Sequence, residues 1–144
     1  MRWSELSVPF GPPGAGDIGV EGVIYDSRLA GPGQIFVAIR GVHRDGHDFV
    51  RAALAGGSPA AVVERRIEGV PGEPLVVVAD SRIALAQLAA AIHGHPSRAL
   101  PVIGVTGTDG KTSTTTMLRS ALAPSLGRVG SLTTVDFRIG DEIE

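Results

Sequence analysis

The chain has 144 residues, of which 43% are hydrophobic and 19% are charged, as in folded globular proteins and unlike disordered ones. Its formal net charge is −2, and it has no polybasic run, so neither a nucleic acid nor a membrane surface is an expected partner. Cysteine is absent, which excludes disulfides and thiolate metal sites. Because the apolar stretches are too short for a signal peptide or a membrane span, we expect a cytoplasmic protein, and its oligomeric state stays open.

Short apolar runs separated by glycine and proline predict strands and helices in alternation over the first hundred residues. Each of these runs is rich in β-forming residues or bounded by Pro, Gly or charge, as in buried strands. We expect strands at 20–24, 34–39, 60–63 and 75–78. The pattern therefore indicates an α/β fold.

Two helices are expected between and after these strands. A short one at 49–55 ends at a glycine pair, and a longer one begins at Asp80 or Ser81 and ends near Gly94. The apolar stripe of the longer helix consists of Leu85, Leu88 and Ile92. The polar residues around Pro96 read as a linker, which predicts a domain boundary near residue 98.

A second strand, loop and helix follow the boundary. We expect a buried strand at 100–105, a glycine-containing loop, a helix at 112–122 that ends before Pro124, a strand at 128–134 and a hairpin at 137–143. These few elements do not cover both faces of a parallel sheet, so the second domain is expected to be incomplete.

The strongest chemical signal is the segment Gly104-Val-Thr-Gly-Thr-Asp-Gly-Lys-Thr112, between the predicted strand and helix. Glycines expose backbone N–H groups to a phosphate, Lys111 reaches the terminal phosphates, and the Thr112 hydroxyl is suited to bind Mg²⁺. The common phosphate-loop spacing has glycine at the position of Val105, so a shorter variant of the motif fits better. The alternative is a glycine turn with a lysine nearby by chance.

A second polar constellation lies in the first half of the chain. It consists of Asp26-Ser27-Arg28, the run Pro32 to Ile39, Gly41 and the segment Asp45 to Phe49. Spacing alone favours caps and turns at both aspartates. The four histidines lie in separate loops without a carboxylate-rich ligand set, so a metal site is not expected there, and His47 is expected to form a local hydrogen bond.

The run Thr106 to Thr112, preceded by Ile-Gly-Val, resembles the ATP loop of the Mur ligases, which usually have Asn where this chain has Asp109. The first-half constellation resembles the N-terminal domain of the MurE-type and MurF-type members, so the resemblance covers nearly the whole chain. The threonine-rich run after Lys111 favours the MurE type. The fold implied is α/β: a small N-terminal substrate domain at 1–98, then the first strand, P-loop and helix of a parallel-sheet ATPase domain, incomplete, at 99–144.

The resemblance also implies roles for particular residues. Contacts with the uridine diphosphate part of the precursor are expected from Tyr25, Ser27, Val42, His43 and Arg44. ATP is expected to bind at Gly107, Thr108, Asp109, Gly110, Lys111, Thr112 and Ser113. In this picture Lys111 is the catalytic residue, and Thr112 binds Mg²⁺ together with ATP.

The activity implied is ATP-dependent amide formation, in which the third amino acid is added to UDP-N-acetylmuramoyl-L-Ala-D-Glu for peptidoglycan. The substrates would be the UDP-linked muramoyl peptide and an amino acid, whose identity the sequence does not give. The later motifs of the family have no match here, so the 144-residue chain alone is expected to be inactive. Two alternatives stay open at this stage: a non-catalytic UDP-sugar-binding module, and an unrelated P-loop NTPase or kinase.

Overall fold

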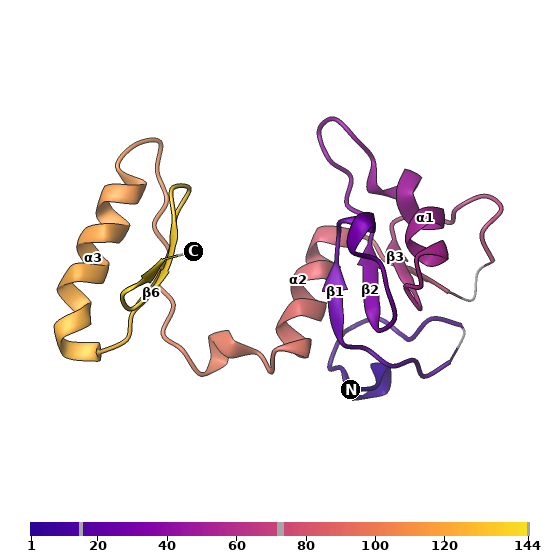
Figure 1. The fold of residues 1–144 in the computed structure, drawn as a ribbon, viewed down its shortest axis with the longest axis horizontal. Coiled ribbons are helices and arrows are strands. Elements are labelled where there is room, and N and C mark those ends of the chain that lie inside the picture. The colour runs from indigo at the N-terminus through magenta and orange to yellow at the C-terminus, as the bar shows by residue number, and fades with distance from the viewer. Residues whose placement is uncertain (15, 72–73, 144) are drawn as a thin grey trace. The chain divides into compact units, whose positions relative to one another are not determined.

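The computed structural model describes residues 1–14, 16–71 and 74–143. It divides into two compact units, Met1–Leu100 and Pro101–Glu144, drawn from indigo to pink and from orange to yellow in Figure 1. The division falls close to the boundary expected near residue 98. None of the helices in the described ranges has the length and apolar character needed to cross a membrane.

The first unit is built on a parallel sheet of four strands in the order β1-β2-β3-β4. The strands pair in register, with Val23 opposite Ile35 and Val62 opposite Val76. Their bounds are β1 (Gly22–Ile24), β2 (Gln34–Val37), β3 (Ala61–Val63) and β4 (Leu75–Val77). All four expected strands are confirmed, each one or two residues shorter than predicted.

Helices cover both faces of this sheet: α1 (Val50–Ala55) lies on one side and α2 (Ser81–Ile92) on the other (Figure 1). Successive side chains of a strand point to opposite faces. In β2, Ile35 packs in the cluster that contains Leu88 of α2, whereas Phe36 packs in the cluster that contains Val50 of α1. The two central strands, β2 and β3, are buried on both faces, which explains why they read as continuous apolar runs.

The start and end of α2 agree with the sequence analysis. The Asp80 carboxylate caps the helix by accepting the N–H groups of Arg82 at 2.8 Å and Ile83 at 3.0 Å. The apolar stripe differs in part, because Leu88 is fully buried but Leu85 is only partly so. The small residues at positions 81, 84 and 91 take the remaining buried places, which lets the helix approach the sheet closely.

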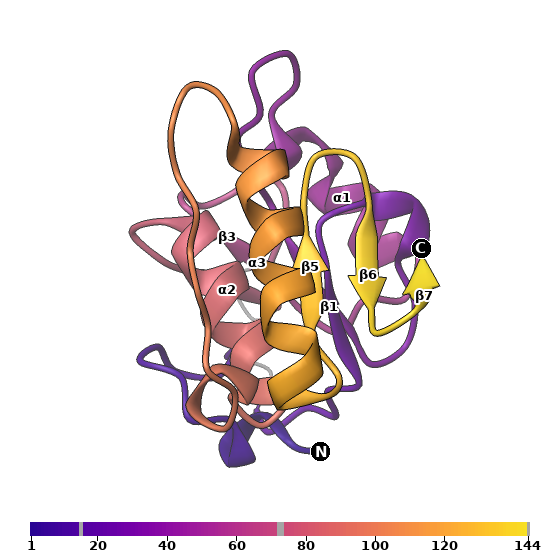
Figure 2. The same cartoon turned by 90° about the vertical axis from the view of Figure 1, so that its left-hand side faces the viewer.

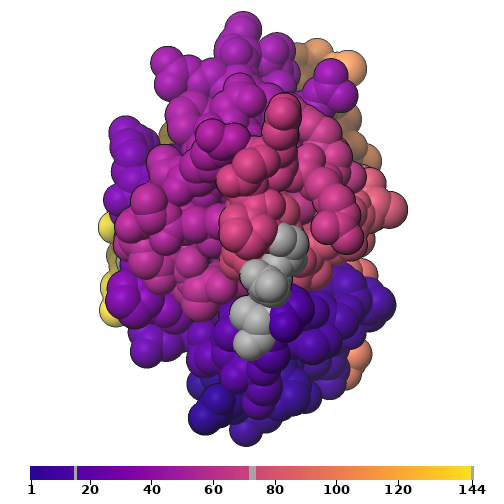
Figure 3. All heavy atoms as spheres, turned by 90° about the vertical axis from the view of Figure 1, so that its right-hand side faces the viewer, coloured from indigo at the N-terminus to yellow at the C-terminus, as the bar shows by residue number. Residues whose placement is uncertain are grey.

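The N-terminal segment completes the core at the lower end of the first unit, drawn in indigo in Figure 3. Trp3, in a 3₁₀ turn (Trp3–Glu5), is 2% exposed, and its backbone N–H donates to the Ile18 carbonyl at 2.9 Å. Its ring packs edge-on against Phe10, with 6.1 Å between the ring centroids. Trp3, Leu6 and Val20 thereby join the cluster under α2.

The second unit contains α3 (Lys111–Leu126) beside a three-stranded antiparallel sheet of β5 (Gly130–Leu132), β6 (Phe137–Ile139) and β7 (Glu142–Ile143) (Figure 2). The hairpin expected around Gly140 is confirmed, and Gly140 takes a positive φ of 61°. None of the described residues of α3 is buried. The strand expected at 128–134 is present as β5, and it pairs antiparallel with the hairpin strand β6.

Two expectations for the second unit are wrong. Residues 100–105 form no strand, and Val102 is 74% exposed; a strand needs a hydrogen-bonded neighbour, and among the described residues none pairs with this run. The helix also continues past Pro124 to Leu126. Proline removes one hydrogen bond within the helix, but only two further residues follow it before the Gly127 N–H closes the helix on the Ala123 carbonyl.

Candidate functional site

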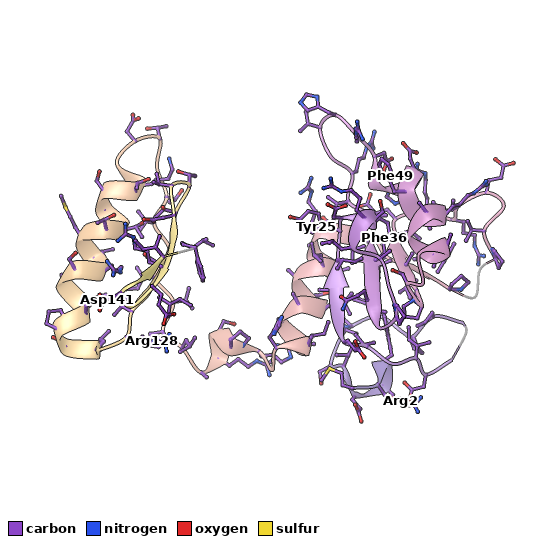
Figure 4. The ribbon with its side chains drawn as sticks, in the orientation of Figure 1. Arg2, Tyr25, Phe36, Phe49, Arg128 and Asp141 are labelled. Carbon is purple, nitrogen blue, oxygen red and sulfur yellow. The ribbon has the colours of Figure 1, made fainter. Side chains whose placement is uncertain are left out.

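The carboxyl edge of the parallel sheet holds the segments predicted to contact UDP. Ile24 of β1 pairs with Phe36 of β2 in parallel, so the residues that follow each strand leave the sheet at the same edge. Tyr25 lies at this edge, whereas Phe36 lies within the sheet (Figure 4). In open α/β sheets, ligands bind outside the carboxyl ends of the strands. The fold therefore brings the two predicted segments to the usual place for a ligand.

The segment after β1 is a short 3₁₀ turn, Ser27–Leu29, capped by Asp26. The Asp26 carboxylate accepts the Arg28 backbone N–H at 3.0 Å and forms an ion pair with its guanidinium at 2.5 Å. The side-chain hydrogen bonds from Arg28, followed by its backbone N–H, lower the pKa of Asp26 to about 2. The cap favoured by spacing is thus present, while Tyr25 is 69% exposed and available to a ligand.

The segment after β2 is a narrow loop that projects upward in the view of Figure 1. Arg40 and Asp45 face each other as an antiparallel bridge, and the Gly41 N–H donates to the Arg44 carbonyl at 2.9 Å. The three residues of the tip are all exposed, with Val42 at 94%. We call Val42, His43 and Arg44 the loop tip. The structure brings the three residues together on one protruding turn.

Below the loop tip, a buried histidine joins the loop to the sheet. His47, 2% exposed, lies in a 3₁₀ turn (Gly46–Phe49), and its Nδ1 is 2.6 Å from the Asp45 carboxylate. Its Nε2 accepts the backbone N–H of Glu64 at 2.9 Å. Since Nε2 accepts this N–H, the hydrogen bond to the Asp45 carboxylate is donated by Nδ1. The expected local hydrogen bond of His47 is confirmed.

The network extends to helix α2. The Glu64 carboxylate accepts the Ser81 N–H at 3.0 Å and the Ser81 hydroxyl at 2.9 Å, and these bonds lower the pKa of Glu64. The pKa of Asp45 is lowered to about 2, chiefly by the backbone N–H of His47 and further by the His47 ring and Arg65. The contact between Glu64 and Ser81 was not expected from the sequence, because no local motif marks a contact across 17 residues.

The predicted ATP loop precedes α3 in the second unit. Gly110 is the N-cap of the helix with φ of 74°, and Gly107 has φ of 149°, which favour glycine. The Lys111 Nζ donates to the carbonyl of Gly107 at 2.5 Å and to that of Thr108 at 3.1 Å. The lysine side chain therefore folds back over the loop, and its ammonium group lies where the loop ends.

Backbone donors are available at the same place. The Thr114 N–H makes the first hydrogen bond of the helix, to the Gly110 carbonyl at 2.9 Å. The N–H groups of the three preceding residues, Lys111, Thr112 and Ser113, come before this bond and lie at the positive end of the helix dipole. Asp109 is exposed in the loop and leaves this backbone arrangement intact. These donors and Lys111 fit a phosphate chain, and the Thr112 hydroxyl fits its accompanying Mg²⁺.

No group of three or more His, Asp or Glu residues within the described ranges is arranged to hold a metal ion. His43 is exposed on the loop tip, whereas His47 is engaged in the buried network. His93 and His95 follow α2.

A family model described as Mur ligase family, catalytic domain, matches residues 19–93, which include β1 to β4 and both segments at the carboxyl edge. The chain belongs to the Mur ligase family. This membership removes the alternative of an unrelated P-loop NTPase or kinase.

Several relatives extend the match beyond that range. The UDP-N-acetylmuramyl-tripeptide synthetase of Roseiflexus sp. (strain RS-1) is 46% identical over 125 residues, which is 86% of this chain and 25% of the relative. The UDP-N-acetylmuramoyl-L-alanyl-D-glutamate–2,6-diaminopimelate ligase of Geobacter metallireducens is 38% identical over 99% of this chain and 28% of its own length. The chain thus spans about a quarter of the length of the curated relatives that it matches.

Among solved structures, the MurF ligase of Thermotoga maritima in complex with ADP is 30% identical, with a TM-score of 0.58. The similarity covers 74% of this chain and 24% of that one. The α/β fold expected from the sequence is therefore the fold of the family.

Proposed function

We propose that this chain is the substrate-anchoring part of a MurE-type ligase, together with the opening of its ATP-binding part. The full enzyme would use ATP to join the third amino acid to UDP-N-acetylmuramoyl-L-Ala-D-Glu in peptidoglycan synthesis. The observation that carries the proposal is the similarity to tripeptide synthetases and diaminopimelate ligases over 86–99% of the chain. We place the full-length enzyme in the cytoplasm, where its nucleotide substrates are found.

The first unit, in this proposal, holds the uridine diphosphate end of the precursor. The exposed Tyr25 ring offers a flat apolar surface, and the Ser27 hydroxyl lies in the adjoining turn at the same edge of the sheet. The loop tip supplies His43 and Arg44 as donors for the diphosphate. Tyr25 and the loop tip are exposed and Ser27 is half-buried, and none of them belongs to a core cluster, so binding requires no rearrangement of the core.

The second unit would hold the phosphates of ATP. Its part is to position charge: the backbone N–H groups at the start of α3 bind phosphate oxygens, and Lys111 neutralises charge on the terminal phosphates. For this, the Lys111 ammonium must leave the carbonyls of Gly107 and Thr108, which are neutral acceptors that a phosphate easily replaces. Thr112 would bind Mg²⁺, which supplies further positive charge beside ATP.

The test is to titrate the 144-residue chain with UDP and with Mg-ATP by calorimetry and to repeat both titrations with Lys111→Ala. The charge-assisted bonds lost are worth about 1.5–3 kcal/mol, so ATP affinity should fall about 10- to 100-fold while UDP affinity stays unchanged. Arg128→Ala is the matched control, because Arg128 carries the same charge in the same unit and forms only an exposed ion pair with Glu142.

Each result bears on a different part of the proposal. Binding of UDP but not of ATP by the wild-type chain would favour the alternative function, a non-catalytic UDP-sugar-binding module. Binding of ATP without UDP would remove the substrate-anchoring role. We expect no ligation by the chain alone, and ATP-dependent joining of an amino acid to the precursor by the purified chain would contradict that expectation.

A further inference from the structure

The projecting loop after β2 is fastened at its base by residues far away in the sequence. The Arg82 guanidinium, from the first turn of α2, donates to the Arg40 carbonyl at 2.9 Å across 42 residues. On the other side of the loop, the Asp45 carboxylate accepts two N–H groups of Arg65, each at 3.2 Å, and contacts the His47 ring at 2.6 Å. Residues outside the loop therefore form hydrogen bonds with both of its ends.

The backbone at the base is also tightly closed. The Gly46 N–H donates to the Ile39 carbonyl at 2.9 Å. A Cβ on Gly46 would lie 2.6 Å from the Ile39 nitrogen and 2.7 Å from the Ile39 carbonyl oxygen. The two chain segments at the base of the loop therefore leave no room for a side chain at Gly46. The loop tip, by contrast, is exposed and makes one backbone bond, from Gly41 to Arg44. Its direction in space is set at the base.

We propose that Arg82, Asp45 and His47 are positioning residues, which hold this loop so that the loop tip meets the diphosphate of the precursor. This inference rests on the proposed function of the first unit. A loop that is already ordered loses less conformational entropy when it binds, and so binds more tightly. None of the three residues needs to touch the ligand.

Arg82 is the residue to test, because its side chain is exposed and it belongs to no core cluster. Its backbone N–H, which donates to the Asp80 carboxylate in the helix cap, is retained in any substitution except proline. Arg82→Ala removes the bond to Arg40 and suits a helix. Arg82→Lys keeps one charged donor for the same carbonyl and serves as the conservative variant. Arg66→Ala, an exposed arginine that holds no part of the loop base, is the control.

Two measurements on the 144-residue chain separate loop order from ligand binding. Amide hydrogen exchange of Gly41 and Gly46 reports on the loop without any ligand. Calorimetric titration with UDP reports on binding. For Arg82→Ala we expect exchange at these two amides to be about 5- to 10-fold faster and the Kd for UDP to rise by a similar factor, since one solvent-exposed hydrogen bond is lost. Arg82→Lys should lie near the wild type, and Arg66→Ala should change neither quantity.

The results distinguish this inference from the proposed function. Faster exchange in Arg82→Ala with unchanged UDP affinity would overturn the positioning role and leave the substrate-anchoring role intact. Unchanged exchange would show that Arg82 does not hold the loop, whatever the affinity. If the wild-type chain fails to bind UDP, the proposed function fails and the positioning role with it, while the exchange data still decide whether Arg82 orders the loop.

Discussion

Asp45 forms an ion pair with Arg65 and a hydrogen bond with the His47 ring at the base of the loop after β2. Its carboxylate accepts N–H groups from His47 and from Arg65, and its pKa is lowered to about 2 from an ordinary value of 3.8. A carboxyl with a lowered folded-state pKa stabilises the fold above its unfolded pKa, and this contribution is lost as the pH falls through the folded value. The window for Asp45 is therefore from about pH 4 down to about pH 2.

We expect Asp45→Asn to be less stable than the wild type at pH 7 and to lose less of its stability between pH 4 and pH 2. Asparagine keeps an acceptor for His47 but has no charge for Arg65 to pair with. Urea unfolding at several pH values, followed by the fluorescence of Trp3, measures both effects. Asp48→Asn removes an exposed carboxylate three residues away and is the control. Parallel pH profiles for Asp45→Asn and the wild type would contradict this account.

Single residues were predictable from the sequence where their partners are local. The cap at Asp26 and the bond between Asp45 and His47 span two residues each, and the side-chain chemistry is sufficient to expect them. The contacts of Glu64 with Ser81 and of Arg82 with Arg40 depend on how α2 packs on the sheet. No spacing in the sequence encodes that packing, so these residues were found only in the structure.

At the scale of elements, α2 is the helix on which the first unit depends. Leu88 has no exposure to solvent, and it packs in the same buried cluster as Trp3. Replacement of Leu88 by alanine should lower the free energy of unfolding by about 2–5 kcal/mol, because a cavity forms in addition to the lost apolar contact.

Urea unfolding monitored by Trp3 measures this loss, since Trp3 is the only tryptophan of the chain. Leu85→Ala is the matched control on the same helix: Leu85 is only partly buried, so its loss should be clearly smaller. Equal losses for the two variants would show that α2 packs on another face than the one described.

The helices and strands that were predicted correctly are each marked by residues within their own segment or directly beside it. Helix α2 has an aspartate cap, an apolar period and a terminal glycine, and each strand of the first sheet is an apolar run with clear ends. The run at 100–105 is mostly apolar, as those strands are, but it contains Pro101 and Gly104 and forms no strand, because a strand also requires a partner and none of the described residues pairs with it. Helix α3 continues past Pro124 because a proline near the last turn costs one hydrogen bond and not the helix.

At the scale of the whole molecule, the buried core belongs to the first unit. The buried hydrophobic residues in the described part of the chain all lie between Trp3 and Ala91, whereas α3 has none. We therefore expect a chain shortened to residues 1–100 to keep the urea midpoint of the 144-residue chain, again followed by Trp3. It should also keep its affinity for UDP. A markedly lower midpoint would mean that the second unit contributes to the stability of the first.

A proline-containing polar linker follows α2, and the boundary expected there near residue 98 lies close to the division between the two compact units. The family relation was predictable from the phosphate loop and the order of the segments after β1 and β2. The antiparallel sheet of the second unit was not, since the apolar run before the phosphate loop suggested a parallel strand. Local sequence describes the hairpin at Gly140 correctly but not the sheet that it joins.

The tight base of the loop after β2 also has an evolutionary consequence. At Gly41 and Gly46 an added Cβ would lie less than 3 Å from backbone atoms, so only glycine fits at these two positions without a shift of the backbone. The side chains of the loop tip between them are exposed, so we expect most substitutions there to have little effect on folding. Random mutagenesis confined to the tip is therefore a library in which nearly every member folds, and ligand preference can be changed there separately from stability.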